Sequence, residues 1–250
     1  MIATIFHLGK EYKIDFFKPI DISMPLSTNL DATCAWYVDP MKLEPVVMGD
    51  WIGDVTKGGS VNFRNIMFNP HGNGTHTECV GHISKEFYTI NKSLKRFVFV
   101  AELITVLPTK LENGDFAITR KQFETALNDI PKPEAIVIRT LSNGSNKLHT
   151  NYSNTNPPFI LKDAIEYLNE LGVRHLLIDM PSIDKEQDGG TLEAHHAFWN
   201  YPNKVELEKT ITELIYVPNE ITDGTYILNL QIAPFENDAS PSKPILYKVY

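Results

Sequence analysis

Three of the eight histidines lie in the segment from His71 to His82, whose sequence is HGNGTHTECVGH. If this segment is extended, side chains two residues apart share a face, so His76 and Glu78 point the same way and the neighbouring threonines point away. One ion could then bind both side chains. Imidazole with carboxylate suits zinc, manganese or iron(II), of which we favour zinc or manganese. The alternative is an ordinary glycine turn, but such a turn needs neither His76 nor Glu78.

A second group, Glu193-Ala-His195-His196, follows a strand-like segment that runs from residue 178 into a polar loop. Loops at strand ends are common places for sites in α/β proteins. Taken alone, two adjacent histidines need no metal, because one ring can be buried and the other solvated. Together with the first cluster, one more imidazole and one more carboxylate would complete a metal shell that leaves a position open for water.

The segments around these residues read as alternating strands and helices. Apolar residues recur at helical spacing from Leu161 to Leu171, and Gly172 follows where a left-handed residue commonly ends a helix. Strands are expected before and after this helix, over 135–139 and 175–179, which predicts a right-handed parallel crossover. Further expected elements are strands over 20–24, 62–68, 97–106 and 226–232, a hairpin or loop over 49–60, and a helix between Thr119 and Pro131. This is a mixed α/β architecture.

Composition and charge restrict the class of protein. With 250 residues and 42% hydrophobic content, we expect one domain over residues 1–250. A formal charge of -8, with lysines and arginines interspersed among the acids, argues against a nucleic-acid partner. We expect no membrane partner, because no apolar run approaches the roughly 18 residues of a membrane span, and no signal peptide. Only Cys34 and Cys79 are present, which favours a reducing cytoplasm.

In these segments the sequence resembles the metal-dependent cyclase family, which includes bacterial kynurenine formamidase and isatin hydrolase. The central family motif is H-x-G-T-H-x-D-x-P-x-H, and residues 74–82 match its second half. Four other segments resemble family landmarks in the same order: 21–26 (DISMPL), 178–184 (IDMPSID), 194–196 (AHH) and 238–241 (DASP). The resemblance covers most of the chain. It implies a swivelling β/β/α fold, a mixed sheet with flanking helices, and assembly as a homodimer or larger homo-oligomer.

The resemblance also implies roles for the early motif. His76 and Glu78 would bind metal, and His82 would be the catalytic residue that moves protons. Gly72 stands at the position of the first family histidine, so His71 would have to replace that ligand from one residue earlier. Glu78 replaces an aspartate and is one methylene longer, which could move the ion or change its coordination.

The later metal ligands implied by the resemblance are His195 and a downstream glutamate. Glu213 is our choice for this glutamate, while Glu206 and Glu208 remain alternatives because residues 200–210 resemble an insertion.

The activity implied by the resemblance is hydrolysis of a non-peptide C–N bond in a small molecule, with an aryl formamide such as N-formylkynurenine as the leading substrate. One or two ions, Zn²⁺ or Mn²⁺, would activate water, and His82 would accept or deliver a proton. Trp36 and Phe63 are candidates for packing the substrate ring, although plain core roles also explain them. The alternatives are an isatin-type hydrolase of a cyclic amide or lactone, and an inactive metal-binding relative. The polar loop 141–156 is either a lid or a solvated connection.

Overall fold

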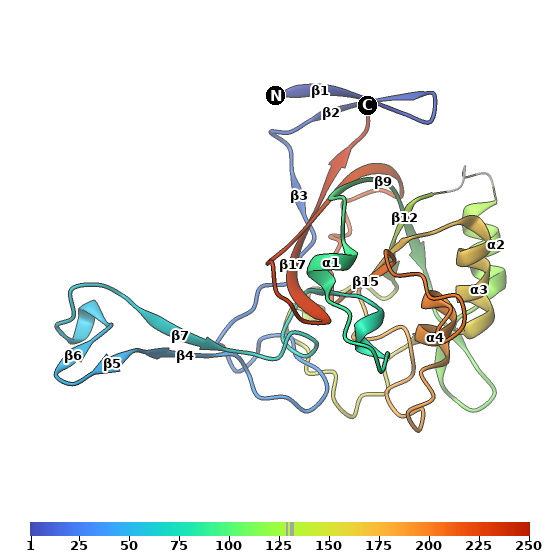
Figure 1. Cartoon of the computed structure of the whole chain (residues 1–250). Helices are drawn as coiled ribbons and strands as arrows, with labels where there is room; N and C mark the ends of the chain where they lie inside the picture. The colour runs from blue at the N-terminus through green and yellow to red at the C-terminus, as the bar shows by residue number, and fades with distance from the viewer. Residues whose placement is uncertain (129, 131–132) are drawn as a thin grey trace.

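The computed structural model describes residues 1–128, 130 and 133–250. Its centre is an eight-stranded mixed sheet in the order β16-β9-β12-β14-β15-β8-β17-β3 (Figure 1). These strands are β3 (Ile20–Asp21), β8 (His76–Glu78), β9 (Val98–Val106), β12 (Ala135–Thr140), β14 (His175–Ile178), β15 (Thr210–Glu213), β16 (Gly224–Ile232) and β17 (Ala239–Lys248). Strands β9, β12, β14 and β15 run parallel, while β8, β16 and β17 pair antiparallel with their neighbours. Because β17 pairs with both β8 and β16, the sheet closes on itself.

The parallel pairing and the intervening helix of the predicted crossover are confirmed. Strands β12 and β14 pair in parallel, and α3 (Lys162–Leu171) lies between them in the chain. The helix buries Ala164, Ile165 and Leu168 at the predicted spacing, and it ends at Gly172 with φ 84°. The amide of Gly172 donates to the carbonyls of the last turn, as a left-handed C-terminal residue does. All residues of β12 are buried, which is typical of a parallel strand covered on both faces.

Helices cover one side of the closed sheet (Figure 1). Alongside α3 lie α2 (Arg120–Leu127) and α4 (Glu193–Trp199), while α1 (Ile90–Ser93) lies elsewhere on the sheet. Thr119 begins α2 with a capping box, as predicted, whereas Pro131 lies outside the described residues. Two apolar clusters result: one between sheet and helices, around Ile136 and Leu168, and one inside the closed sheet, around Val137. The predicted mixed sheet with flanking helices is therefore confirmed.

A long ribbon projects from this body (Figure 1). It comprises residues 42–67 and is called the arm below. It is built from β4 (Lys42–Pro45), β5 (Val47–Met48), β6 (Trp51–Ile52), the short helix η1 (Val55–Lys57) and β7 (Arg64–Met67). For residues 49–60, predicted as a hairpin or a surface loop, the structure has the turn of the β5–β6 hairpin at 49–50, then β6 and η1, and the connection toward β7. All four residues of β7 are exposed, so the predicted strand over 62–68 forms without a core contact along β7.

The remaining elements are short. A hairpin of β1 (Ile2–His7) and β2 (Lys10–Asp15) lies near the C-terminus, where the Tyr250 amide donates to the Lys13 carbonyl (Figure 1). A small sheet joins β10 (Thr109–Lys110), β11 (Phe116–Ile118) and β13 (Phe159–Ile160), and single turns form η2 (Val80–His82) and η3 (Ser145–His149). Among the described residues, no helix has the length and apolar character needed to cross a membrane.

Candidate metal centre

Strand β8 carries His76 and Glu78 and lies between β15 and β17. Its register places His76 opposite Glu213 on one neighbour and opposite Pro241 on the other. The strand is completely buried, and the threonine at position 77 bonds Thr212 on β15 at 2.8 Å. His76 and Glu78 therefore project to one face, as the two-residue period predicts.

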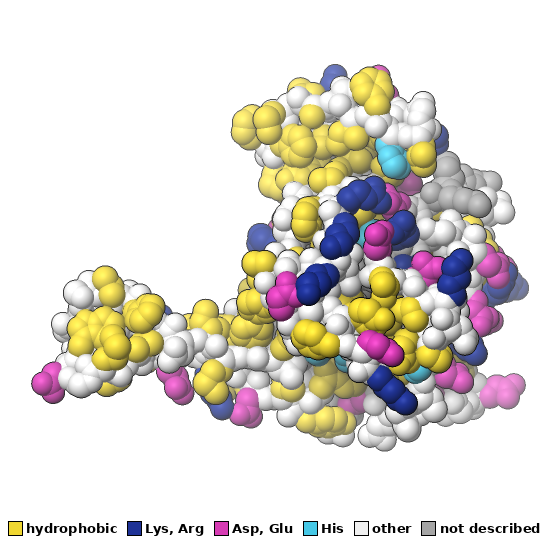
Figure 2. All heavy atoms as spheres, in the orientation of Figure 1, with side chains coloured by type: hydrophobic (Ala, Val, Ile, Leu, Met, Phe, Trp, Pro, Cys, Tyr) yellow, Lys and Arg dark blue, Asp and Glu magenta, His cyan; other side chains and the backbone are white. Residues whose placement is uncertain are grey.

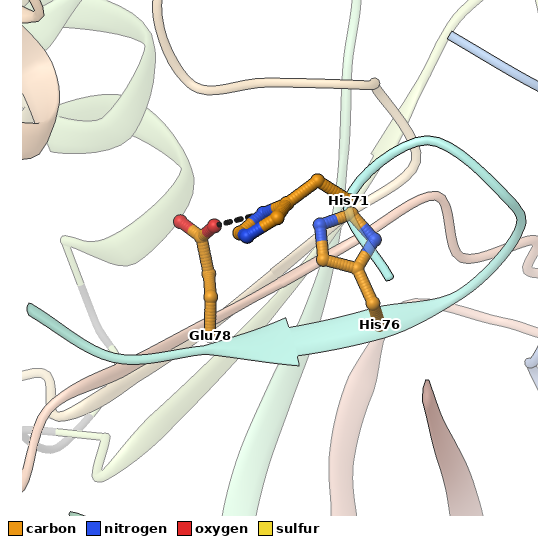
Figure 3. A group of neighbouring side chains, drawn as sticks. All are labelled: His71, His76 and Glu78. Carbon is orange, nitrogen blue, oxygen red and sulfur yellow. Dashed lines mark ion pairs between the residues drawn. The ribbon is translucent and has the colours of Figure 1, made fainter. Parts of the chain in front are cut away.

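The side chains of His71, His76 and Glu78 converge on one point (Figure 3). One ligand atom from each lies within 4.8 Å of the others. Nδ1 of His71 lies 3.1 Å from Oε2 of Glu78, the ion pair drawn in the figure. On the adjacent strand, Oε2 of Glu213 lies 3.3 Å from Nε2 of His76. Three chain segments thus bring two imidazoles and two carboxylates together.

Helix α4 supplies His195 from the opposite side. Its Nε2 lies 3.2 Å from Oε1 of Glu78 and 3.9 Å from Oε1 of Glu213. Its Nδ1 lies 2.6 Å from Oδ2 of Asp184, whose two oxygens also accept the amides of Ala194 and His195. Asp184 therefore fixes both the first turn of α4 and the imidazole ring, with Nε2 directed at the cluster.

His82 lies at the exposed side of the cluster. Its Nδ1 is 3.8 Å from Oε2 of Glu78 and 3.6 Å from Oδ2 of Asp238, and its ring lies 4.3 Å from that of His71. His71 is more strongly engaged, because its Nε2 lies 2.7 Å from the same oxygen of Asp238. Both ring nitrogens of His71 thus face carboxylates, whereas His82 approaches the same carboxylates less closely.

Burial and neighbouring charge perturb these groups. Burial opposes the charged form of His71, but hydrogen bonds to Asp238 and Glu78 raise its pKa to about 10. Burial, followed by the charge of Glu78, raises the pKa of Glu213. Burial also acts against ionised Glu78, yet His82, His195 and His71 together hold its pKa below the ordinary value. A cation among these groups would let both buried glutamates ionise.

The donor set fits a divalent metal. Nε2 of His76, Oε2 of Glu78 and Oε1 of Glu213 are buried, and none makes a well-directed hydrogen bond among the described residues, although ion-pair partners lie 3.3 Å from Nε2 of His76 and 3.1 Å from Oε2 of Glu78. Buried polar atoms are normally satisfied, so three such atoms in one cluster indicate a group that completes them. Nitrogen and carboxylate oxygen are ligands that zinc and manganese both accept. The cluster is thus suited to hold a metal through His76, Glu78, His195 and Glu213, with His71 alongside.

A cavity of about 350 Å³ opens beside the cluster. Four residues of the cluster, His71, His82, His195 and Glu213, line it. The other lining residues are the apolar Trp36, Val38 and Leu192 and the polar or charged Asn69, Ser182, Asp184, Lys185, Glu186 and Asp188. The cavity therefore combines the cluster with a few apolar side chains and several polar ones, as small-molecule sites do.

The predicted site residues fall into two groups. Seven lie in the cluster or line its cavity: Trp36, His71, His76, Glu78, His82, His195 and Glu213. Phe63, expected near the substrate ring, lies instead on the arm, where it is 54% exposed and contacts Trp51. The alternatives to Glu213 also lie outside, because Glu206 is exposed and Glu208 pairs with Arg174 on the surface.

Position 72 cannot carry a side chain in this backbone. A Cβ there would lie 2.4 Å from Cγ2 of Val38 and 2.9 Å from the carbonyl oxygen of Ala35. The loop that bears Trp36 thus fills the space next to Gly72, and the imidazole that reaches the cluster comes from His71.

Two acidic residues of the site escaped the sequence analysis as functional candidates. Asp184 contacts His195, and Asp238 contacts His71 and His82. Both lie in segments that resemble family landmarks, and this resemblance is the sequence signal that could have identified them. Their roles depend on contacts between segments 11 and 167 residues apart in sequence, which no local pattern encodes.

Comparisons with known proteins agree with this geometry. A family model described as "Putative cyclase" matches residues 20–185. A kynurenine formamidase of Bacillus cereus is 27% identical over 230 residues, covering 91% of this chain and 96% of the relative. A kynurenine formamidase of Bacillus anthracis is 26% identical over 235 residues, covering 92% and 97%.

Solved structures share the fold. A predicted metal-dependent hydrolase from Bacillus stearothermophilus has a TM-score of 0.64 at 19% identity, covering 92% of this chain and 98% of that one. Isatin hydrolase A from Labrenzia aggregata also has a TM-score of 0.64, at 16% identity, covering 93% and 94%. The family match spans more than half of the chain. The chain therefore belongs to this cyclase family, and its relatives support a hydrolase.

Proposed function

We propose that this protein is a metal-dependent amidohydrolase that cleaves a small aryl formamide, with N-formylkynurenine as the leading substrate. The observation that carries the proposal is the cluster of His76, Glu78, His195 and Glu213, with its unsatisfied buried atoms, at the wall of a cavity. The names of the formamidase relatives, which match over nine-tenths of the chain, supply the substrate class. We propose Zn²⁺ or Mn²⁺, one or two ions, as the metal.

A bound divalent metal would supply Lewis acidity, which lowers the pKa of water and polarises a carbonyl. The chain's own residues provide the remaining chemistry. His82 lines the cavity and can accept a proton from the attacking water, then deliver it to the leaving amine. Asp238 lies within 3.6 Å of Nδ1 of His82 and would orient its ring. Trp36 and Leu192, which also line the cavity, would pack the aromatic ring and exclude water from it.

The test is hydrolysis of N-formylkynurenine by metal-loaded protein. His82→Ala should lower kcat by about 10²–10⁴-fold while the protein keeps its metal, because general acid–base catalysis contributes about that much. His149→Ala is the matched control, since His149 is exposed and pairs with Asp31. Activity on isatin alone would favour the cyclic-amide alternative. Metal binding without turnover of either compound would indicate an inactive relative.

We further propose that the protein assembles as a homodimer or larger homo-oligomer through the arm. Its exposed large hydrophobic residues are Leu43, Val47, Met48, Val55, Val61, Phe63, Ile66 and Met67. Figure 2 shows this apolar surface standing clear of the body. A two-stranded ribbon is only marginally stable in water by itself, so a packing partner would stabilise the arm.

A second copy is the favoured partner because the arm carries no net charge within an acidic chain. Lys42, Lys57 and Arg64 balance Glu44, Asp50 and Asp54. Two copies can therefore meet here without the repulsion expected from a charge of -8. Light scattering should show a dimer or larger species. Ile66→Lys should shift it toward monomer, while Lys57→Arg, which keeps the charge of the arm, should not. A monomeric parent would refute this assembly.

We also propose a cytoplasmic location, since Cys34 and Cys79 are both free thiols.

A further inference from the structure

The segment that carries Trp36 has an unusual backbone. Trp36 and Tyr37 follow one another with φ of 59° and 58°, in the left-handed region that favours glycine. Bulky residues adopt this conformation only where surrounding contacts hold them, and such segments gather at functional sites. Trp36 is half-buried and lines the cavity, while Tyr37 is exposed. Hydrogen bonds made by Tyr37, the next residue in the chain, can therefore fix the position of Trp36.

One carboxylate holds Tyr37 in place. The Tyr37 hydroxyl donates to Oε1 of Glu186 at 2.9 Å. The same oxygen accepts the amide of Asn154 at 2.6 Å, and Oε2 accepts the amide of Asn156 at 3.0 Å. The Tyr37 amide donates in turn to Oγ of Ser153 at 2.9 Å. Glu186 thus fastens the 36–37 segment and the 153–156 loop to the loop that leads into α4.

The electrostatics agree with an ionised, fully engaged carboxylate. Burial would raise the pKa of Glu186, but the two backbone amides and the Tyr37 hydroxyl outweigh it and lower the pKa. Asn154 and Asn156 are themselves left-handed, with φ of 63° and 48°. Three left-handed residues, Tyr37, Asn154 and Asn156, therefore donate hydrogen bonds to the single carboxylate of Glu186.

On its other side, the segment that carries Trp36 is hydrogen-bonded to the loop that contains Gly72. The amide of Ala35 donates to the carbonyl of Gly72 at 3.0 Å. Cys34 exchanges backbone hydrogen bonds with the next loop, through Thr150 and Tyr152. Trp36 consequently lies between the Gly72 loop and the Glu186 contacts. The loop expected to be a lid or a solvated connection supports the cavity wall through its residues 150–156.

We propose that Glu186 is a positioning residue, which with Tyr37 clamps Trp36 in the cavity wall so that Trp36 can receive the aromatic ring of the substrate. This inference rests on the proposed function for the identity of the substrate, and on the hydrogen bonds above for the clamp. The clamp bonds none of the proposed metal ligands. Loss of these hydrogen bonds should therefore weaken substrate binding without changing the metal content or the rate of the chemical step.

The first experiment needs no substrate. Trp199 is fully buried, so in a Trp51→Phe background acrylamide quenching of tryptophan fluorescence reports mainly on Trp36. Glu186→Ala removes all three acceptor contacts and should raise the quenching constant about twofold or more, as expected for a side chain released to solvent. Tyr37→Phe removes the hydroxyl, which also lies 3.3 Å from Oδ1 of Asn154, but leaves both amides bonded to Glu186, so it should give a smaller rise. Glu220→Gln, an exposed glutamate, should give none.

The second experiment separates binding from chemistry. With N-formylkynurenine as the probe, Glu186→Ala should raise KM about tenfold and leave kcat within about twofold. The reason is that Trp36 would have to become ordered when the substrate binds. Metal content should equal that of the parent. Unchanged quenching in both clamp variants, or a fall in kcat at constant KM, would overturn the clamp. If quenching rises but the parent cleaves no formamide, the proposed function fails and the clamp stands.

Discussion

The contact between Asp184 and His195 provides a quantitative test of how the metal site is built. Oδ2 of Asp184 lies 2.6 Å from Nδ1 of His195, and Asp184 is buried. Asp184→Asn keeps the size but removes the charge and replaces one acceptor by a donor. A hydrogen bond to a charged group contributes about 1.5–3 kcal/mol, which corresponds to about 10–100-fold in affinity. Loss of a carboxylate behind a metal-bound histidine has an effect of the same size.

The assay is competition between metal-free protein and a fluorescent zinc chelator. We expect Asp184→Asn to bind zinc about 10–100-fold more weakly than the parent. Asp163→Asn, an exposed aspartate in the first turn of α3, is the matched control and should bind as the parent does. A folded Asp184→Asn protein with unchanged zinc affinity would refute the assignment of His195 as a ligand oriented by Asp184.

Three further predictions concern the fold. Leu168→Ala should lower the free energy of unfolding by about 2–5 kcal/mol in urea titrations, because the side chain is fully buried between α3 and the sheet. Gly72→Ala should cost about 1–3 kcal/mol through the clash with Val38, and adding Val38→Ala should recover part of it. Burial lowers the pKa of His175 from 6.5 to about 3, so the unfolded chain binds its proton first as the pH falls. Between pH 7 and pH 5 the parent should lose about 2 kcal/mol more stability than His175→Gln, and equal losses would contradict this.

Local periodicity was sufficient to predict several features. The two-residue alternation placed His76 and Glu78 on one face because β8 is a regular strand. The helix over α3 and its glycine end followed from apolar spacing and from the conformational freedom of Gly172. These patterns depend on neighbours within a turn or a strand, so they are visible in one sequence.

Other features depend on contacts that local patterns do not record. Strand β17 was not predicted, because it contains Pro241 and Pro244 and pairs with three different strands. Phe63 is aromatic, as many pocket residues are, but it belongs to the arm, which projects from the body. Asp238 directly precedes β17 and reaches His71 because β17 pairs with β8, whereas Asp184 reaches His195 because its loop folds back onto the start of α4.

Metal content measured by plasma mass spectrometry on untagged protein tests the central claim most directly. The parent and the control His149→Ala should carry one or two zinc or manganese ions per subunit, whereas His76→Ala and His195→Ala should lose them after identical purification. A parent that contains no metal, and binds neither zinc nor manganese when they are added, would contradict the proposed metal centre and the hydrolase mechanism built on it.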